Sequence, residues 1–256
     1  MTDRIADTYF SIMIERMQQV QDTQMDAIEA AADICAQSIM DDKLVFSFGT
    51  GHGSFAALEM FPRTGTVTGF RPIVESSMIS FHRVHGDGGA RQYRFIHARE
   101  GYGDAILASH DTVPGDTMLI FSHSGLNAVT LDIAVGAKAQ GMKLIGVTSV
   151  PHSSATPSRH SCGQRLFELA DVVIDTGVPL GDASIAIDGM KGKTGATSTS
   201  IAIVIGHAIN SATAARITAA GRDPFIMQSP NTTDKDAATA QNNLNYAELS
   251  RRLKLR

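Results

Sequence analysis

The chain has 256 residues, of which 43% are apolar and 19% are charged, as is typical of a globular protein with a sizeable core. Its net charge of −4 gives no basic field that would attract nucleic acid or a membrane surface, so neither partner is expected. The polar N-terminus does not resemble a signal peptide, and the two cysteines, Cys35 and Cys162, lack a disulfide or metal-ligand pattern. We therefore expect reduced thiols and a cytoplasmic location.

Hydrophobic periodicity predicts alternating helices and strands along most of the chain. In chain order the predicted elements are a helix over 4–40, a strand over 44–48, a short helix to about 61, a helix near 99–110, a strand over 117–121, a helix over 127–140, a strand over 143–148, a helix over about 161–169, a strand over 171–175, a helix over 196–220 and a final basic helix within 222–256. Polar loops are predicted at 149–160 and 176–195, and the Gly- and Arg-rich region 64–95 receives no assignment. Val- and Ile-rich strands that alternate with helices through short turns indicate an α/β fold with a parallel sheet covered on both faces.

Two turns rich in small polar residues follow predicted strands. They are Gly-Thr-Gly-His-Gly-Ser at 49–54 and Ser-His-Ser-Gly-Leu-Asn at 122–127. Ligands of open parallel sheets bind outside the carboxyl ends of the strands, where both turns are expected to lie. The first turn lacks the third glycine of a dinucleotide-binding motif and the Gly-Lys-Ser/Thr of a P-loop, so nucleotide binding is not expected.

The second turn has the composition of an anion site. A helix N-terminus presents unpaired backbone N–H groups, and small hydroxyl side chains add donors without blocking the approach of an anion. Ser122, Ser124 and Asn127 fit this role, and Thr50 and Ser54 of the first turn are predicted to form a second wall. The alternative is that Ser124 and Asn127 only cap the helix that follows. Two such turns on neighbouring strands favour the anion site.

The ordered set of motifs resembles the SIS (sugar isomerase) family. The strand, the Ser-His-Ser-Gly-Leu-Asn turn, a preceding Pro-Gly-Asp and a following A-x-x-x-G-M-K-L-I-G-V-T-S carry the resemblance. The segments GTGHG…EMFPRTG, EGYG, SRHSCGQRLFELADVVID, GDA and SPNT are similar to SIS proteins of comparable length described as phosphosugar-binding or phosphoheptose isomerase-like. The resemblance covers residues 1–235 as one domain that includes the helix 4–40, and it leaves 236–256 as a C-terminal helical tail.

This resemblance implies a three-layer α/β/α sandwich with five parallel strands, flavodoxin-like in topology. It also implies a sugar-phosphate ligand and, commonly, a homodimer with shared sites. The implied activity is an aldose–ketose sugar-phosphate isomerase that works through a carboxylate base. Two alternatives stay open, namely a phosphosugar lyase or etherase and a non-catalytic phosphosugar sensor. Sensors of this kind generally carry a DNA-binding helix-turn-helix, and the first 40 residues lack a basic recognition helix.

Glu59 is the predicted base, because it follows the first turn on a short helix and a carboxylate with a shifted pKa can move a proton between adjacent carbons. The alternative is a surface ion pair with Arg63 at i+4. Phosphoheptose isomerases carry a metal-binding His and, four residues later, a Glu at the positions aligned with Glu59 and Arg63. Because this chain departs from that pattern, the mechanism is not carried over, and Arg63 is assigned to an anionic group of the substrate.

Several histidines and one aspartate complete the candidate site. His52 in the first turn is a candidate for ring opening or proton transfer, and His160 is a further catalytic candidate. His123 in the second turn and Asp182 in a Gly-flanked turn are assigned to substrate binding, although Asp182 could equally cap a turn. His207 lies roughly where the phosphoheptose isomerases carry another metal ligand, but its neighbours Ile205, Ala208 and Ile209 favour a position packed in the core.

No cofactor is expected from the sequence. His82 and His85 could share a helix face, but a zinc site needs a third and usually a fourth ligand, and the sequence supplies no assigned set. We predict no metal residues and leave a divalent ion open.

Overall fold

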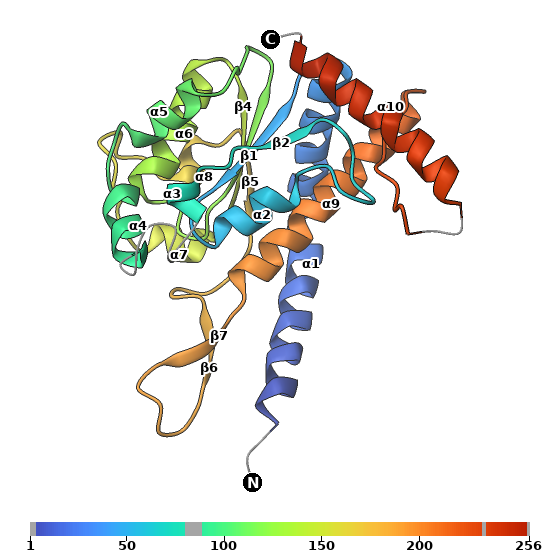
Figure 1. Cartoon of the computed structure of the whole chain (residues 1–256). Coiled ribbons are helices and arrows are strands. Elements are labelled where there is room, and N and C mark those ends of the chain that lie inside the picture. The colour runs from blue at the N-terminus through green and yellow to red at the C-terminus, as the bar shows by residue number, and fades with distance from the viewer. Residues whose placement is uncertain (1–3, 80–88, 232–233, 255–256) are drawn as a thin grey trace.

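A five-stranded parallel sheet lies at the centre of the computed structural model, which describes residues 4–79, 89–231 and 234–254 (Figure 1). The strands are β1 (Val45–Gly49), β2 (Phe70–Pro72), β3 (Thr117–Phe121), β4 (Lys143–Thr148) and β5 (Val172–Asp175), in the spatial order β2-β1-β3-β4-β5. The predicted three-layer fold with flavodoxin-like strand order is confirmed. Strand β2 lies in the region that the sequence left unassigned, because three residues are too few to show a period.

Helices cover both faces of this sheet. The helices α1 (Ile5–Met40), α2 (Gly53–Glu59) and α9 (Ser198–Ala219) pack on one face, and α5 (Tyr102–Ala108), α6 (Ala128–Ala139) and α8 (Leu166–Leu169) pack on the other. Leu119 and Phe121 of β3 belong to the first core cluster, whereas Met118 and Ile120 belong to the second. This division follows from the alternation of side chains along a strand, and it explains why β3 is apolar throughout.

Some elements differ from the prediction because they are short. The predicted loop 149–160 contains α7 (Val150–Ser154), which is capped at Ser149 by a hydrogen bond from the His152 N–H to the Ser149 hydroxyl. The predicted loop 176–195 contains an antiparallel hairpin of β6 (Ala183–Ala186) and β7 (Lys193–Ala196). Two further helices, α3 (Ser76–Ile79) and α4 (Gly89–His97), lie in or next to the unassigned region. β6, β7, α3 and α7 have five residues or fewer and are too brief for hydrophobic periodicity to identify, whereas α4 has nine residues and begins within the unassigned Gly- and Arg-rich region.

Helix α9 has the length and apolar composition that a membrane span would need, among the residues described. Its isoleucines Ile201, Ile205 and Ile209 are nevertheless buried in the core that α1 and α2 share with the sheet. This is the packing of a core helix.

The C-terminal end of helix α10 (Lys235–Lys254) lies beside the C-terminal end of α1 (Figure 1). Arg252 is buried and donates hydrogen bonds from Nη1 to the carbonyl oxygens of Ile39, at 2.7 Å, and Lys43, at 3.2 Å. Asn245 is also buried and donates to the Ile226 carbonyl at 2.9 Å. The segment predicted as a tail is therefore attached by buried polar contacts.

Candidate functional site

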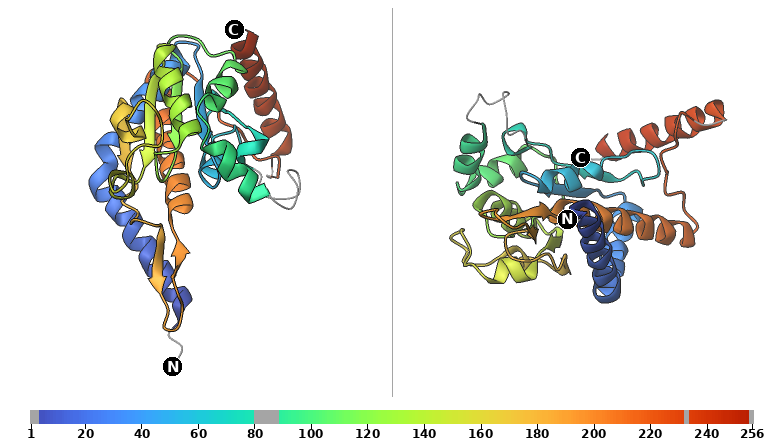
Figure 2. Two further views of the ribbon diagram at one scale, coloured as in Figure 1. Left: turned by 90° about the vertical axis from the view of Figure 1, so that its left-hand side faces the viewer. Right: turned by 90° about the horizontal axis from the view of Figure 1, so that it is seen from below.

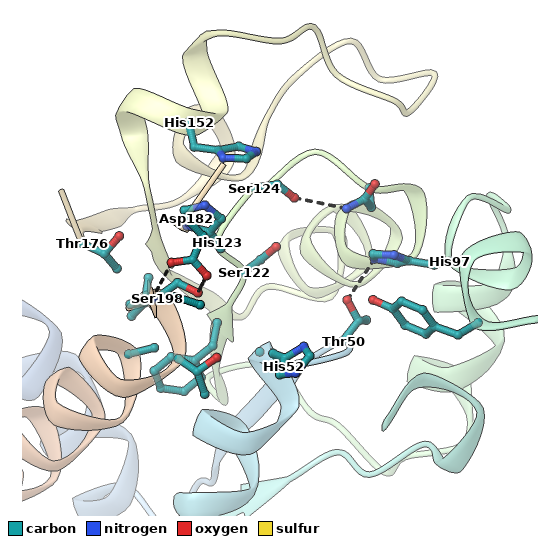
Figure 3. A pocket seen from close by; sticks show the side chains of 18 residues that line it. Thr50, His52, His97, Ser122, His123, Ser124, His152, Thr176, Asp182 and Ser198 are labelled. Carbon is teal, nitrogen blue, oxygen red and sulfur yellow. Dashed lines mark hydrogen bonds between the residues drawn. The ribbon is translucent and has the colours of Figure 1, made fainter. Parts of the chain in front are cut away.

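A cavity of about 380 Å³ opens at the carboxyl edge of the sheet, between the turns that follow β1 and β3 (Figure 3). The strand order reverses between these two strands, and ligands of open α/β sheets bind at such a switch point. Helix α4, helix α7, the β6–β7 hairpin and the start of α9 supply the remaining walls.

Two glycines allow the turns to close around this cavity. A Cβ atom on Gly53 would lie 2.4 Å from the carbonyl oxygen of Phe121, so only glycine lets α2 begin this close to the end of β3. Gly125 has a φ of +59°, and a Cβ atom there would lie 2.9 Å from Oγ1 of Thr148. Both positions therefore favour glycine for a local geometric reason.

The 122–127 turn presents hydroxyl donors to the cavity. The Ser122 hydroxyl accepts a hydrogen bond from the Gly125 N–H at 3.1 Å, and the Ser124 hydroxyl accepts one from Nδ2 of Asn127 at 3.1 Å. Because each oxygen is engaged as an acceptor, its own hydrogen is oriented away and can be donated to a ligand. Asn127 occupies the N-cap position of α6, yet its side chain makes no cap hydrogen bond to the described helix. The geometry thus disfavours the alternative that Asn127 only caps α6.

His123, in the same turn, has two buried ring nitrogens without a hydrogen-bond partner among the described residues. Its ring lies edge-on to that of His152, with 4.3 Å between centroids, and both line the cavity (Figure 3). Burial, followed by the nearby His152, lowers the pKa of His123 to about 4. The imidazole is therefore neutral near pH 7, and it can accept a proton or a hydrogen bond.

Asp182 lines the cavity but has structural partners. Its carboxylate accepts hydrogen bonds from the Thr197 N–H and the Ser198 N–H, both at 2.9 Å, and from the Ser198 hydroxyl at 2.7 Å. Burial alone would raise the pKa of Asp182, but these hydrogen bonds outweigh it and lower the pKa. Asp182 thus holds the first turn of α9 against the hairpin, which agrees with the capping alternative and leaves one edge of the carboxylate at the cavity.

The opposite wall comes from α4 and the first turn. Oγ1 of Thr50 lies 2.9 Å from Nε2 of His97, and the Tyr93 ring stacks on the His97 ring at 4.9 Å (Figure 3). Burial, followed by the charge of Arg159, lowers the pKa of His97 to about 4. His52 also lines the cavity, as predicted for a residue of this turn, and its ring is exposed and lies 5.7 Å from that of Phe55.

Glu59 and Arg63 are not among the described lining residues. The Glu59 carboxylate pairs with Arg63, as the i+4 alternative predicted, and lies 3.0 Å from Nε2 of His207 on α9. Burial would raise the pKa of Glu59, but the bonds to Arg63 and His207 lower it, which weakens the carboxylate as a base. The expectation that His207 is a core residue is wrong, because its side chain is 42% exposed and pairs with Glu59.

Two other candidates also have structural partners outside the lining. The Ser54 hydroxyl donates to the Gly51 carbonyl at 2.6 Å and so closes its own turn. His160 accepts a hydrogen bond at Nδ1 from the Cys162 N–H, at 3.0 Å, and its Nε2 lies 3.0 Å from the buried carboxylate of Asp132. Because Nδ1 accepts, Nε2 carries the hydrogen and donates it to Asp132. Both ring nitrogens of His160 are thereby engaged.

Sequence reasoning missed Tyr93, His97 and His152 as lining residues. Tyr93 and His97 belong to a helix that the pattern did not reveal. His152 follows β4 in the same way that the predicted turns follow β1 and β3, so its position at the carboxyl edge was a usable signal. No three His, Cys, Asp or Glu residues in the described ranges are close enough to hold a metal ion. His82 and His85 lie outside those ranges, so the absence of a metal stays a prediction.

The architecture and the site define an α/β protein with a turn of small polar residues, 122–127, at the switch point of its parallel sheet. Residues 8–149 match the family model of the SIS domain. A UPF0309 protein of Shouchella clausii is 32% identical over 232 residues, which are 90% of this chain and 92% of the relative. The chain therefore belongs to the SIS domain family and, within it, to the UPF0309 group.

Solved structures share the fold. Phosphoheptose isomerase of Neisseria gonorrhoeae matches with a TM-score of 0.54 and 16% identity, over 84% of this chain and all (100%) of that one. The NanR protein of Vibrio vulnificus, solved with ManNAc-6P, matches with a TM-score of 0.52 and 10% identity, over 96% of this chain and 70% of that one. At these identities the likeness establishes the fold alone.

Proposed function

We propose that this chain binds a sugar phosphate in the cavity, with the phosphate group at the 122–127 turn. The observation that carries this proposal is that Ser122 and Ser124 each have a hydroxyl hydrogen to donate beside the uncapped N-terminus of α6. A phosphate has acceptor oxygens and close to two negative charges at neutral pH, and both features match donors at a helix N-terminus. The ligand of NanR supports this substrate class by analogy of fold.

The reaction proposed is an aldose–ketose isomerisation. Such a reaction moves a proton from the carbon beside the carbonyl to the carbonyl carbon through an enediol, and the base must reach that carbon. Within the described lining, His123 supplies ring nitrogens that no protein group occupies. A bound phosphate dianion raises the pKa of a neighbouring imidazole, because it favours the charged form. We therefore place the base at His123, ahead of the carboxylate of Glu59.

A second candidate is a phosphosugar-binding protein that performs no chemistry. Asp182 is the one carboxylate in the described lining, and three hydrogen bonds occupy it, so the cavity offers no free carboxylate base. Exchange of the sugar proton beside the carbonyl with deuterium from solvent separates the candidates, since a binder promotes none. A lyase also abstracts a proton, and its products distinguish it from an isomerase.

Replacement of Ser124 by Ala tests the phosphate site. We expect about tenfold weaker binding of sugar phosphates, because a hydrogen bond to a charged group contributes roughly 1.5–3 kcal/mol. The free energy of unfolding should change by no more than about 1 kcal/mol. A thermal-shift titration with sugar phosphates and their unphosphorylated sugars measures the effect. Ser154→Ala on α7, which removes an exposed hydroxyl, is the control. Equal affinity in Ser124→Ala and the control contradicts the phosphate assignment.

We also propose a homodimer that uses the N-terminal half of α1. Phe10 and Ile14 are 66% and 63% exposed and share one helix face, and Leu180 at the hairpin is 62% exposed. The hairpin lies beside this half of α1 in both views (Figures 1 and 2), and Tyr9 donates to the Ala196 carbonyl at 2.9 Å. When two copies of the chain associate through this surface, its exposed apolar area is removed from water, which stabilises the dimer.

Phe10→Glu combined with Ile14→Glu should therefore give a monomer in light scattering at micromolar concentration, whereas the wild type should be a dimer. Leu244→Glu, at a 57% exposed position on α10, is the matched control and should remain dimeric. A wild-type monomer at that concentration contradicts the proposal.

A further inference from the structure

The segment between α7 and α8 crosses over the anion-binding turn and carries an arginine. The Arg159 N–H donates to the Leu126 carbonyl at 3.0 Å, and Nη1 of Arg159 donates to Oδ1 of Asn127 at 3.3 Å. These contacts place Arg159 directly on the turn, although its side chain is exposed.

Two contacts to the side of the sheet that α5 and α6 cover hold this segment in place. His160 donates to the buried carboxylate of Asp132 on α6, and the Ser161 N–H donates to Oε1 of Glu100 at 2.7 Å. Asp132 also accepts from the Gly103 N–H at 3.0 Å, so α5, α6 and the segment share one polar cluster. The residues next to Arg159 are thereby anchored, and Arg159 has a defined backbone position.

A chain of hydrogen bonds leads from Arg159 to the cavity. Arg159 donates to the amide oxygen of Asn127, which fixes the orientation of that amide, and Nδ2 of Asn127 then donates to the Ser124 hydroxyl. With its oxygen engaged as an acceptor, Ser124 keeps its own hydrogen available for a ligand in the cavity that it lines. The amide of Asn127 is thus set in the one orientation that turns Ser124 into a donor.

The charge of Arg159 also reaches the cavity. It contributes to lowering the pKa of His97 on one wall and that of His152 on the other, in both cases after burial. No Lys or Arg side chain belongs to the cavity lining in the described ranges. Arg159, which contacts the lining residue Asn127, therefore supplies positive charge beside a lining that has no Lys or Arg among its described residues.

We propose that Arg159 is a positioning residue of the anion site, which orients Asn127 and Ser124 as donors and supplies the positive charge that draws a phosphate dianion to the cavity. This inference rests on the proposed function, because it assigns Arg159 a role in the same phosphate site. Arg159 acts through Asn127, and its planar guanidinium suits both the amide oxygen and a phosphate oxygen.

The test measures the affinity for inorganic phosphate by calorimetry in the wild type, Arg159→Gln, Arg159→Lys and Lys143→Gln. Lys143 is exposed at the start of β4, at the edge of the sheet opposite the cavity. Lys143→Gln removes one positive charge, as Arg159→Gln does, and therefore serves as the control. We expect about three- to tenfold weaker phosphate binding in Arg159→Gln, since the contact is exposed to solvent, and an intermediate loss in Arg159→Lys. Affinity should also depend less steeply on salt in Arg159→Gln than in the wild type.

A second measurement tests whether the charge of Arg159 acts on the histidines of the cavity. Titration of the ring protons by NMR should show higher pKa values for His97 and His152 in Arg159→Gln than in Lys143→Gln, which a purely structural role does not produce. Phosphate affinity and histidine pKa values equal to those of the control overturn the inference and leave the proposed function standing. A wild type that binds neither phosphate nor any sugar phosphate overturns both.

Discussion

His123→Gln should lower the rate of deuterium exchange at the sugar carbon beside the carbonyl by about 10²–10⁴-fold, the usual cost of losing a general base. Glutamine keeps a polar side chain of similar size, but it cannot accept a proton. The expectation rests on His123 lining the cavity and on its two buried ring nitrogens, which have no hydrogen-bond partner in the described chain. Exchange followed by NMR in deuterated buffer, with a sugar phosphate selected by thermal shift, provides the measurement. Affinity for that sugar phosphate should change little, since the phosphate contacts lie at Ser122 and Ser124.

Glu59→Gln is the control for this result. Its carboxylate pairs with Arg63 and His207 away from the lining, so exchange should persist in this variant. Exchange that is lost in Glu59→Gln and kept in His123→Gln would restore the carboxylate base expected from the family resemblance. The wild-type rate should also decrease at acid pH, because protonated His123 cannot take up a second proton. No exchange with any tightly bound sugar phosphate would favour the non-catalytic binder.

Arg252→Met should lower the free energy of unfolding by about 3 kcal/mol, at the lower end of the cost of breaking a buried ion pair. Arg252 is 6% exposed, and its guanidinium bonds the Ile39 and Lys43 carbonyls and Glu248, with 2.8 Å between Nη2 and Oε1. Methionine retains the apolar stem but removes the side-chain donor of the Ile39 and Lys43 carbonyls and leaves the Ile39 carbonyl, within the described chain, only its hydrogen bond from the Asp42 N–H, at 3.2 Å. Unfolding by urea, followed by circular dichroism, measures the change.

Arg251→Met is the matched control, because Arg251 is adjacent, half-exposed and also paired with Glu248. An exposed pair of this kind contributes about 0.2–1 kcal/mol, so the control should lose far less stability. Equal losses in the two variants would show that α10 is held by its surface charges. A negligible loss in both would make α10 a separable tail, in line with the predicted division at residues 235 and 236.

The parallel sheet could be predicted from the sequence because its strands are locally encoded. β3 and β4 are apolar runs that end in turns of small residues, and a fully buried strand must be apolar on both faces. The position of the 122–127 turn at the cavity was predictable for the same reason, since Ser122, Ser124 and Gly125 are neighbours in the chain and their hydrogen bonds span only a few residues. Short elements such as β2 and α7 escaped prediction, because a few residues contain no measurable period.

The sequence by itself thus determined four strands of the sheet, its main covering helices and the turn of small polar residues at 122–127. Only the tertiary structure decided which side chains share the cavity with that turn. His97 on α4 and His152 on α7 come from segments far apart in the chain, and the packing of these segments around one edge of the sheet brings them to opposite walls. Glu59 and His160, which the sequence placed at the site, lie against His207 and Asp132 instead. The direction of a polar side chain depends on the partner that packing provides, and that partner is not encoded next to it in the sequence.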